Sequence, residues 1–267
     1  MRLANGRFAR ALGASFVLAF ALGASSGPVL AQTAPPGIDH YLVYRVQPGV
    51  PFGAVVALRD QFRPTFLTHD VFGMPLWANW VSKDGSQVSN TQLHYSWYSI
   101  TPDGFRADVI VSNQFGDQTV HVFDSHYLLN PALKFPPAGQ PLPIANHYKC
   151  YDADGPPPQP APRTVNLQDQ FGTRQAVVGN ARYFCNPVDK QYQGQFHPME
   201  RPDAHFVCYQ IFRQPPQPTN FPITFRDQFL SAQTTLVEEV LLCVPTIKHE
   251  VVATRPSTWG GVKAIYR

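Results

Sequence analysis

The sequence predicts an all-β protein made of four diverged repeats of about 55 residues each. Three short motifs recur four times in the same order along the chain. Apolar residues alternate with polar ones in the second motif, which is the periodicity of a half-buried strand. Proline is frequent, at 27 of 267 residues, and no long uninterrupted amphipathic stretch stands out. These observations favour strands joined by stiff loops over helices.

The N-terminus has the pattern of a cleavable export signal. Arg2, Arg7 and Arg10 form a basic region, and residues 11–24 are apolar. Residues 29–31 (Val-Leu-Ala) offer a signal-peptidase site, so we expect cleavage after Ala31 and a signal peptide over residues 1–31. The apolar stretch is too short for a spanning helix, and no later segment is apolar enough for one. The sequence therefore predicts a secreted or periplasmic protein without a transmembrane segment after signal removal.

Charge argues against a nucleic-acid partner. The chain has 21 Lys and Arg against 18 Asp and Glu, and residues 1–31 hold three arginines and no acid. The chain that remains after cleavage is therefore electrically balanced. A nucleic-acid-binding protein is expected to keep a basic excess, so we predict no nucleic-acid partner.

The first motif is His, an aromatic residue, any residue, a Cys or apolar residue, and Tyr. It begins at His40, His94, His147 and His205. Its aromatic and β-branched character is typical of a short strand. We interpret the repeated histidines as half-buried residues at strand starts, because a single repeat supplies no second metal ligand nearby.

The second motif ends each alternating stretch with Asp or Asn, then Gln, then Phe. The twelve residues are Asp60, Gln61, Phe62, Asn113, Gln114, Phe115, Asp169, Gln170, Phe171, Asp227, Gln228 and Phe229. Alternation places the Asp or Asn on the buried face near the strand end, where its oxygen can accept hydrogen bonds from turn backbone. The Gln lies on the opposite face. We interpret the motif as structural, with a polar binding face as the alternative.

The third motif places Lys five residues after a Cys or apolar position. The pairs are Ala78 and Lys83, Leu129 and Lys134, Cys185 and Lys190, and Cys243 and Lys248. It also has strand character. Three strands per repeat leave open edges, so we expect neighbouring repeats to pair into two small β-sandwich or barrel lobes. A four-bladed β-propeller is the alternative.

The expected domain boundaries follow from the repeats and from a proline-rich segment between the second and third of them. Lobe 1 spans 38–134, the linker 135–145 and lobe 2 146–250, followed by a C-terminal tail, 251–267. Stiff proline-rich stretches also separate the first and second motifs, and we expect them to lie outside the sheets.

The four cysteines are predicted to form two structural disulfides. All lie in the last two repeats, and repeats one and two lack both Cys positions of the unit together. Joint loss is what a bonded pair predicts. Of the three possible connectivities we therefore favour Cys150–Cys185 and Cys208–Cys243. No Cys-x-x-Cys spacing points to a metal site.

No residue pattern predicts a catalytic, cofactor-binding or metal-ligating site, so the chain leans toward a protein without enzymatic activity. Tryptophan could stack on sugar rings, and the chain has Trp77, Trp80, Trp97 and Trp259. Trp97 stands where other repeats have Cys, so we expect it in the core. Trp77 and Trp80 flank the equivalent Ala78, whereas Trp259 lies outside the repeats.

The combined pattern resembles a family of uncharacterised repeats in exported bacterial proteins. The units His147–Lys190 and His205–Lys248 carry it most clearly, with Cys-x-Pro-x-x-Lys closing the first, and residues 40–134 carry a degenerate form. The resemblance implies secretion and paired cysteines, and it implies no activity.

The sequence favours an exported, non-catalytic binding or surface module, because repeated scaffolds usually present surfaces. The partner that exposed aromatic residues would suit is a polysaccharide or another component of the cell envelope. Two alternatives remain open at this point: a structural envelope or matrix protein, and a secreted hydrolase whose site lies in a non-repeated pocket.

Overall fold

The computed structural model describes residue 35, residues 37–215 and residues 218–252. The predicted signal peptide and residues 253–267, which include Trp259, lie outside this part of the chain. The described residues are strands and connecting loops, and none of them forms a helix long and apolar enough to cross a membrane. In chain order the strands are β1 (His40–Arg59), β2 (Leu67–Lys83), β3 (His94–Ile100), β4 (Arg106–Asn113), β5 (Gly116–Lys134), β6 (His147–Gly155), β7 (Arg163–Asp169), β8 (Gly172–Tyr192), β9 (Gln195–His197), β10 (His205–Gln214), β11 (Phe221–Arg226) and β12 (Ser231–Val252).

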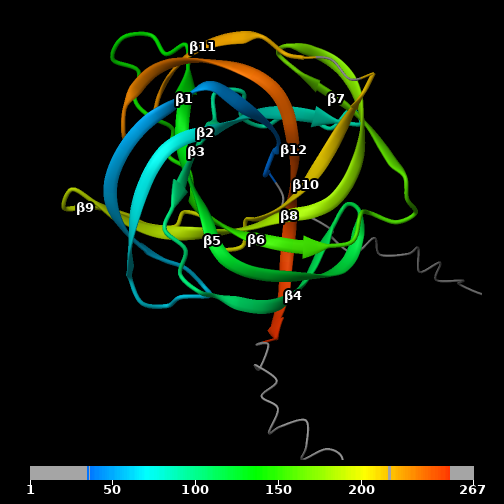
Figure 1. Ribbon diagram of the computed structural model, residues 1–267, viewed down its shortest axis with the longest axis horizontal. Coiled ribbons are helices and arrows are strands. Elements are labelled where there is room, and N and C mark those ends of the chain that lie inside the picture. Colours follow the sequence, from blue (N-terminus) through cyan, green and yellow to red (C-terminus); the bar gives the residue numbers. More distant parts are fainter. Residues whose placement is uncertain (1–34, 36, 216–217, 253–267) are drawn as a thin grey trace, which may run out of the picture. The chain divides into compact units, whose positions relative to one another are not determined.

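Eight of these strands form a closed antiparallel ring, which we call the strand ring. Each repeat contributes its first and third motif, and neighbouring strands follow the order β1, β2, β3, β5, β6, β8, β10 and β12. The last of these pairs back onto β1, with Cys243 opposite Tyr41. Figure 1 shows these strands around a common centre. The all-β repeat architecture predicted from the sequence is confirmed.

The second motif of each repeat forms an outer layer over the strand ring. In β4, β7, β11 and the second half of β1 it pairs with the long strand that follows it. Each outer segment also pairs with the end of the long strand two repeats away. Leu58 lies opposite Lys190, Val111 opposite Lys248, Leu167 opposite Lys83, and Phe225 opposite Lys134. Every repeat therefore buries its apolar face against a distant repeat.

The interior of the strand ring is filled by two layers of equivalent side chains. Tyr41, Tyr95, Tyr148 and Phe206 contact one another around the interior, with ring centroids 4.9–5.7 Å apart. The next layer consists of four cross-strand pairs: Val43 with Ala78, Trp97 with Leu129, Cys150 with Cys185, and Cys208 with Cys243. The fully buried Trp97 thus fills interior space that disulfides occupy in repeats three and four.

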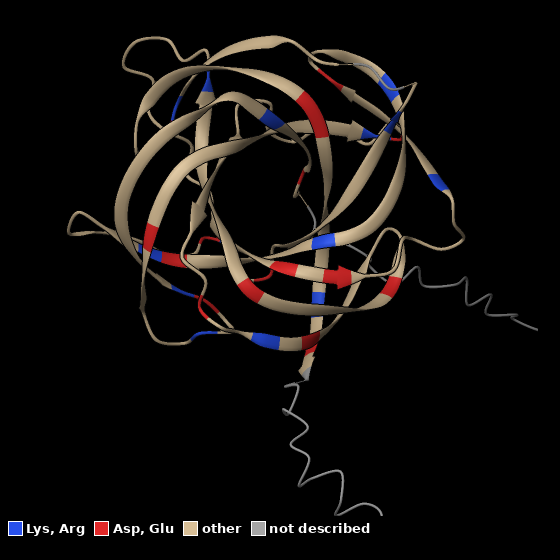
Figure 2. Ribbon diagram, in the orientation of Figure 1, with Lys and Arg blue, Asp and Glu red and all other residues tan. Residues whose placement is uncertain are grey.

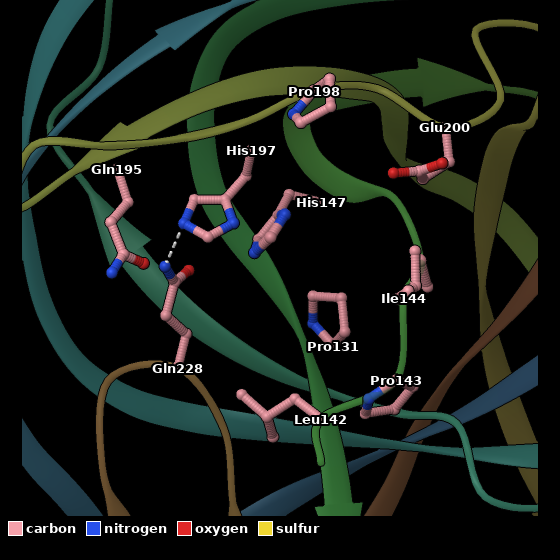
Figure 3. Close-up of a pocket in the computed structure, with 11 residues that line it drawn as sticks. Pro131, Leu142, Pro143, Ile144, His147, Gln195, His197, Pro198, Glu200 and Gln228 are labelled. Carbon is pink, nitrogen blue, oxygen red and sulfur yellow. Dashed lines mark hydrogen bonds between the residues drawn. The ribbon is translucent and has the colours of Figure 1, made fainter.

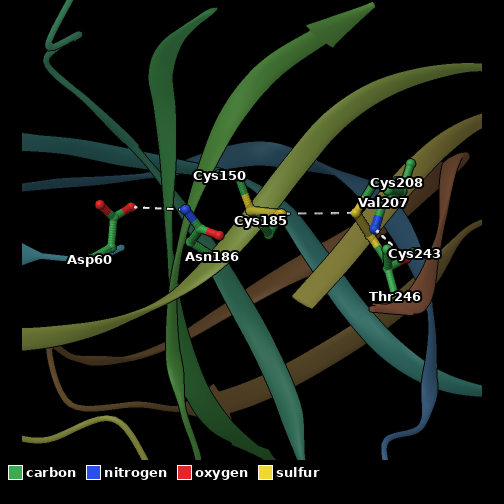
Figure 4. The surroundings of a disulfide bond; sticks show 8 residues. All are labelled: Asp60, Cys150, Cys185, Asn186, Val207, Cys208, Cys243 and Thr246. Atoms are coloured by element: carbon green, nitrogen blue, oxygen red, sulfur yellow. Dashed lines mark hydrogen bonds between the residues drawn. A yellow bond between two sulfur atoms is a disulfide. The ribbon is translucent and has the colours of Figure 1, made fainter. Parts of the chain in front are cut away.

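Both disulfides have the connectivity favoured by the sequence. Cys150 bonds Cys185 and Cys208 bonds Cys243, each with a separation of 35 residues. They lie side by side, because the Sγ atoms of Cys185 and Cys208 are 4.0 Å apart (Figure 4). In the chain-entropy model, a disulfide that closes a loop of this length stabilises the fold by about 4 kcal/mol.

The arrangement of the repeats differs from the two lobes and from the four separate blades that we expected. The sheet continues from repeat two to repeat three, where Tyr127 lies opposite Cys150, and from repeat four to repeat one. Residues 135–145 connect β5 to β6 within this sheet. The physical reason is edge closure: two paired repeats would still expose two strand edges, whereas four repeats in a ring pair every edge of the ring.

Candidate functional site

The acidic residue of the second motif has two structural contacts. In Asp227, Oδ1 accepts hydrogen bonds from the backbone N–H groups of Phe229 at 2.7 Å and Leu230 at 3.0 Å. Its Oδ2 accepts the hydroxyl hydrogen of Tyr98, from repeat two, at 2.7 Å. One carboxylate therefore closes a turn and ties two distant repeats together.

The same contact recurs in all four repeats. The Tyr that ends each first motif reaches the acidic or amide residue two repeats away, in the pairs Tyr44–Asp169, Tyr98–Asp227, Tyr151–Asp60 and Tyr209–Asn113. In the last pair the amide of Asn113 donates at 2.9 Å to the tyrosine oxygen. Burial raises the pKa of these tyrosine hydroxyls, that of Tyr209 to about 12. The four tyrosines therefore remain neutral hydrogen-bonding groups.

The Phe and Lys positions also pair between repeats. Each repeated lysine Nζ lies over the motif phenylalanine of the next repeat, in the pairs Lys83–Phe115, Lys134–Phe171, Lys190–Phe229 and Lys248–Phe62, at 4.6–5.2 Å from the ring centroid. This distance is that of a cation–π contact. The motif glutamines are less uniform: Gln61 and Gln170 are exposed, while Gln114 contacts His40 and Gln228 contacts His197.

The repeated histidines are buried and neutral. Burial lowers the pKa of His40 to about 4 and those of His94 and His205 to about 3. Burial also lowers the pKa of His147 far below its usual range. A histidine that stays neutral at physiological pH is not poised to shuttle protons near neutrality. Within the described ranges, no three or more His, Cys, Asp or Glu side chains gather as metal ligands.

The three tryptophans of the described residues do not form an exposed sugar-binding face. Trp77 and Trp97 are fully buried, and Trp80 is half-buried with its indole N–H donating to the carbonyl of Thr91 at 2.8 Å. The exposed large apolar side chains of the described residues include instead Phe72, Phe196 and Phe212, each about half exposed. Within the part of the chain that the structure describes, a ligand site built on exposed aromatic residues therefore uses tyrosine or phenylalanine.

One pocket of about 430 Å³ lies beside β9 (Figure 3). Pro131, Pro143, Ile144 and Pro198 give it a largely apolar wall, and the Ile144 side chain is highly exposed. Its polar side contains His147, Gln195, His197, Glu200 and Gln228. The Nε2 atoms of Gln228 and His197 are 2.5 Å apart, so the amide donates to a neutral imidazole. This pocket has a largely apolar wall, and two of its polar side chains, Gln228 and His197, are hydrogen-bonded to each other.

A second cleft, of about 390 Å³, opens at one end of the strand-ring interior, and we call it the mouth cleft. Its lining residues are Arg45, Leu76, Tyr127, Arg182, Tyr183, Gln210, Ile211, Phe212, Glu238, Glu239, Val240 and Leu241. Leu76, Tyr127, Tyr183 and Leu241 occupy the same position in the four repeats, two residues before the disulfide layer. Residues two apart on a strand share a face, so these four form the last interior layer before solvent.

The chemistry of the mouth cleft comes from residues that differ between repeats. The last interior layer contains Leu in repeats one and four but Tyr in repeats two and three. Tyr127 and Tyr183 contact each other edge to face, with centroids 5.3 Å apart, and Tyr183 also contacts Trp97. Phe212, about half exposed, lines the cleft beside them. Phe212 and the partly exposed Tyr183 thus present aromatic surface at an open cleft, and the largely buried Tyr127 packs behind Tyr183.

A β-bulge sets the direction of the residue before each of these tyrosines. On β8 the partner of Cys208 is Tyr183 and the partner of Tyr209 is Ala181, so Arg182 is an extra residue. The same irregularity makes His126 an extra residue on β5 and Val240 an extra residue on β12. Bulges turn a side chain out of the regular alternation and are common beside functional sites. In this way the bulge brings Arg182 to the cleft beside Tyr183.

Most of the charged groups at the mouth cleft are paired. Arg45 Nε donates to Glu238 Oε2 at 2.9 Å. Glu239 Oε1 forms an ion pair with Arg174, whose Nε lies 2.7 Å away, and it accepts a hydrogen bond from Arg213 Nη1 at 3.3 Å. Burial raises the pKa of Glu239, and these two arginines oppose that effect. Figure 2 shows both signs of charge on the strands around the ring.

The sequence alone did not indicate this site. Its tyrosines and arginines belong to no repeated motif, and the bulge that orients Arg182 is a one-residue register shift between β8 and β10. The sequence did contain one indication of the site. Repeats two and three have Tyr at the position two residues before the disulfide layer, where repeats one and four have Leu.

Comparison with protein families adds a match over the repeats. The model of a family described as a repeat of unknown function (DUF7450) matches residues 94–245, from the first motif of repeat two into the end of repeat four. No curated protein and no solved structure matches the chain.

Proposed function

We propose, from the premise that this chain belongs to the DUF7450 family of repeats of unknown function, that it is an exported, non-catalytic module that binds glycan at the mouth cleft. The observation that carries the proposal is an open cleft lined by the aromatic residues Phe212, Tyr183 and the largely buried Tyr127, which also contains Arg182, Gln210 and Glu238. Aromatic faces pack on the apolar faces of sugar rings, and planar polar side chains bond their hydroxyl groups.

Export is supported by two features. The N-terminal sequence has the order of a cleavable signal, and disulfides persist in oxidising compartments such as the periplasm and the extracellular space. A binding role without catalysis is supported by the state of the repeated polar residues. Their histidines are neutral and their carboxylates bond tyrosines and turn backbone, so they serve the scaffold.

The proposal is tested by binding to a panel of soluble neutral and acidic polysaccharides and to isolated cell-wall material. We expect the purified chain to bind at least one of them, and the substitution Tyr183→Ala to weaken that binding about tenfold, which corresponds to about 1.4 kcal/mol. Phe196→Ala is the control, because Phe196 is an exposed aromatic residue on β9 that does not line the cleft. Thermal melting of each variant checks that it is folded.

Two results would overturn the proposal. One is that the wild-type chain binds no member of the panel. The other is that folded Tyr183→Ala binds as tightly as the Phe196→Ala control.

A further inference from the structure

One arginine at the mouth cleft has no carboxylate partner. Arg45 is paired with Glu238 and Arg213 with Glu239, whereas no ion pair or hydrogen bond of the described residues uses the exposed Arg182 side chain. The nearby carboxylate of Asp152 contacts His126, with Nδ1 and Oδ1 3.1 Å apart. The positive charge of Arg182 is therefore the one at this cleft that is free to meet a ligand.

The position of Arg182 is built by the fold. It is the extra residue of the bulge on β8, directly before Tyr183. The equivalent positions in the other repeats carry Pro75, His126 and Val240, so only repeat three places a guanidinium here. Guanidinium groups bond carboxylates through two parallel N–H donors, which fixes orientation as well as charge.

From this placement we infer that the mouth cleft selects acidic glycans, specifically sugars that carry a carboxylate. In the bound state the sugar ring packs on Tyr183 and its carboxylate accepts two hydrogen bonds from Arg182. This inference rests on the glycan-binding function proposed above and adds the class of sugar. It also assigns a reason for the pairing of Arg45 and Arg213 with glutamates, since that pairing leaves a single free cation to define the position of the anion.

The test compares two forms of one oligosaccharide by isothermal titration calorimetry. The probes are an oligogalacturonate and its methyl ester, which share a backbone and differ in the carboxylate charge. We expect the full-length chain to bind the free acid at least tenfold more tightly than the ester, and we expect this preference to shrink when NaCl is raised from 50 to 500 mM, because exposed charges are screened.

Substitutions at Arg182 assign the preference to this residue. Arg182→Gln is expected to bind the acid and the ester with equal affinity, because the neutral amide offers no charge to the carboxylate. Arg182→Lys is expected to recover only part of the preference, because an ammonium group lacks the paired donors. Arg106→Gln is the control, since Arg106 is exposed on β4 and does not line the cleft.

The outcomes separate this inference from the proposed function. Equal wild-type binding of acid and ester, or an acid preference that survives in Arg182→Gln, overturns the inference while glycan binding stands. Tighter binding of a sulfated oligosaccharide than of the carboxylated one overturns the assignment of a carboxylate. Absence of binding to every glycan of the wider panel overturns both.

Discussion

At the scale of single residues, the repeated polar side chains hold the molecule together at long range. Asp227 shows this most clearly, because it accepts hydrogen bonds from two backbone N–H groups of its own turn and from the hydroxyls of Ser96 and Tyr98 in repeat two. The sequence motif reveals the turn contact, since an Asp at the end of an alternating strand commonly accepts from nearby backbone. It does not reveal the tyrosine, since no local pattern names a partner about 130 residues away.

This leads to a prediction for two substitutions of the same residue. Asp227→Ala leaves two backbone donors and the Tyr98 hydroxyl without an acceptor, so we expect it to lower the free energy of unfolding by about 2–4 kcal/mol. Asp227→Asn keeps the turn acceptor and resembles the natural Asn113–Tyr209 pair. Because burial already raises the pKa of Asp227, loss of its charge is expected to cost less than about 1 kcal/mol. Urea unfolding of both variants checks the difference, and equal destabilisation contradicts it.

At the scale of elements, the cross-strand pairs inside the strand ring occupy equivalent positions in the four repeats but consist of different residue types. The same register holds Val43 with Ala78 in repeat one and Cys150 with Cys185 in repeat three. The sequence was sufficient to predict the disulfides, since both members of a pair are absent together. The bulge that turns Arg182 into the mouth cleft was not predictable, because it depends on the register of β8 against β10.

We predict that a disulfide can be replaced by the apolar pair of repeat one. The double substitution Cys150→Val and Cys185→Ala is expected to fold, with the Cys208–Cys243 bond intact, and to lose about 2–4 kcal/mol of unfolding free energy. Denaturant unfolding under non-reducing conditions measures the loss. The control is the wild-type chain unfolded under reducing conditions, where neither disulfide is present. We expect it to lose more unfolding free energy than the double variant does. A double variant that fails to fold would contradict the equivalence of the pairs.

At the scale of the whole molecule, the sequence predicted strands and repeats but not their arrangement. The motifs mark which segments are strands, and the alternation marks their buried faces. Both faces of the long strands are buried, one inside the strand ring and one under the outer layer, and the outer layer comes from two repeats away. Four copies of one motif are chemically alike, so the chain pattern is equally compatible with pairing to the next repeat or to the one beyond it.

Because every repeat contains one of these histidines, the stability of the whole molecule is expected to depend on pH. The unfolded chain takes up protons near pH 6.5, whereas His40 does so in the fold only near pH 4 and His94 and His205 only near pH 3. Between these values the unfolded state binds more protons, so stability is lost as pH falls below about 6.5. Each histidine contributes up to about 1.4 kcal/mol per pH unit.

The corresponding experiment is chemical unfolding between pH 7 and pH 4. His94→Phe keeps an aromatic ring beside Trp77, on which His94 is stacked, and is expected to reduce the slope by one histidine's share. Phe196→Leu is the control, since Phe196 is exposed on β9 and has no titratable group, so the slope is expected to stay unchanged. Unfolding free energies that are the same at pH 7 and pH 4 would contradict the prediction.

The pairing of β12 with β1 also determines when the strand ring can close during folding. A chain that is made or delivered from its N-terminus offers β1 long before β12 exists, and until then two edges stay open and the tyrosine contacts of the first two repeats lack their partners. Completion therefore waits for the last strand. Because the closing strand pair and the tyrosine contacts join segments far apart in the sequence, folding is expected to be slow, and the unpaired strand edges stay exposed until β12 pairs with β1.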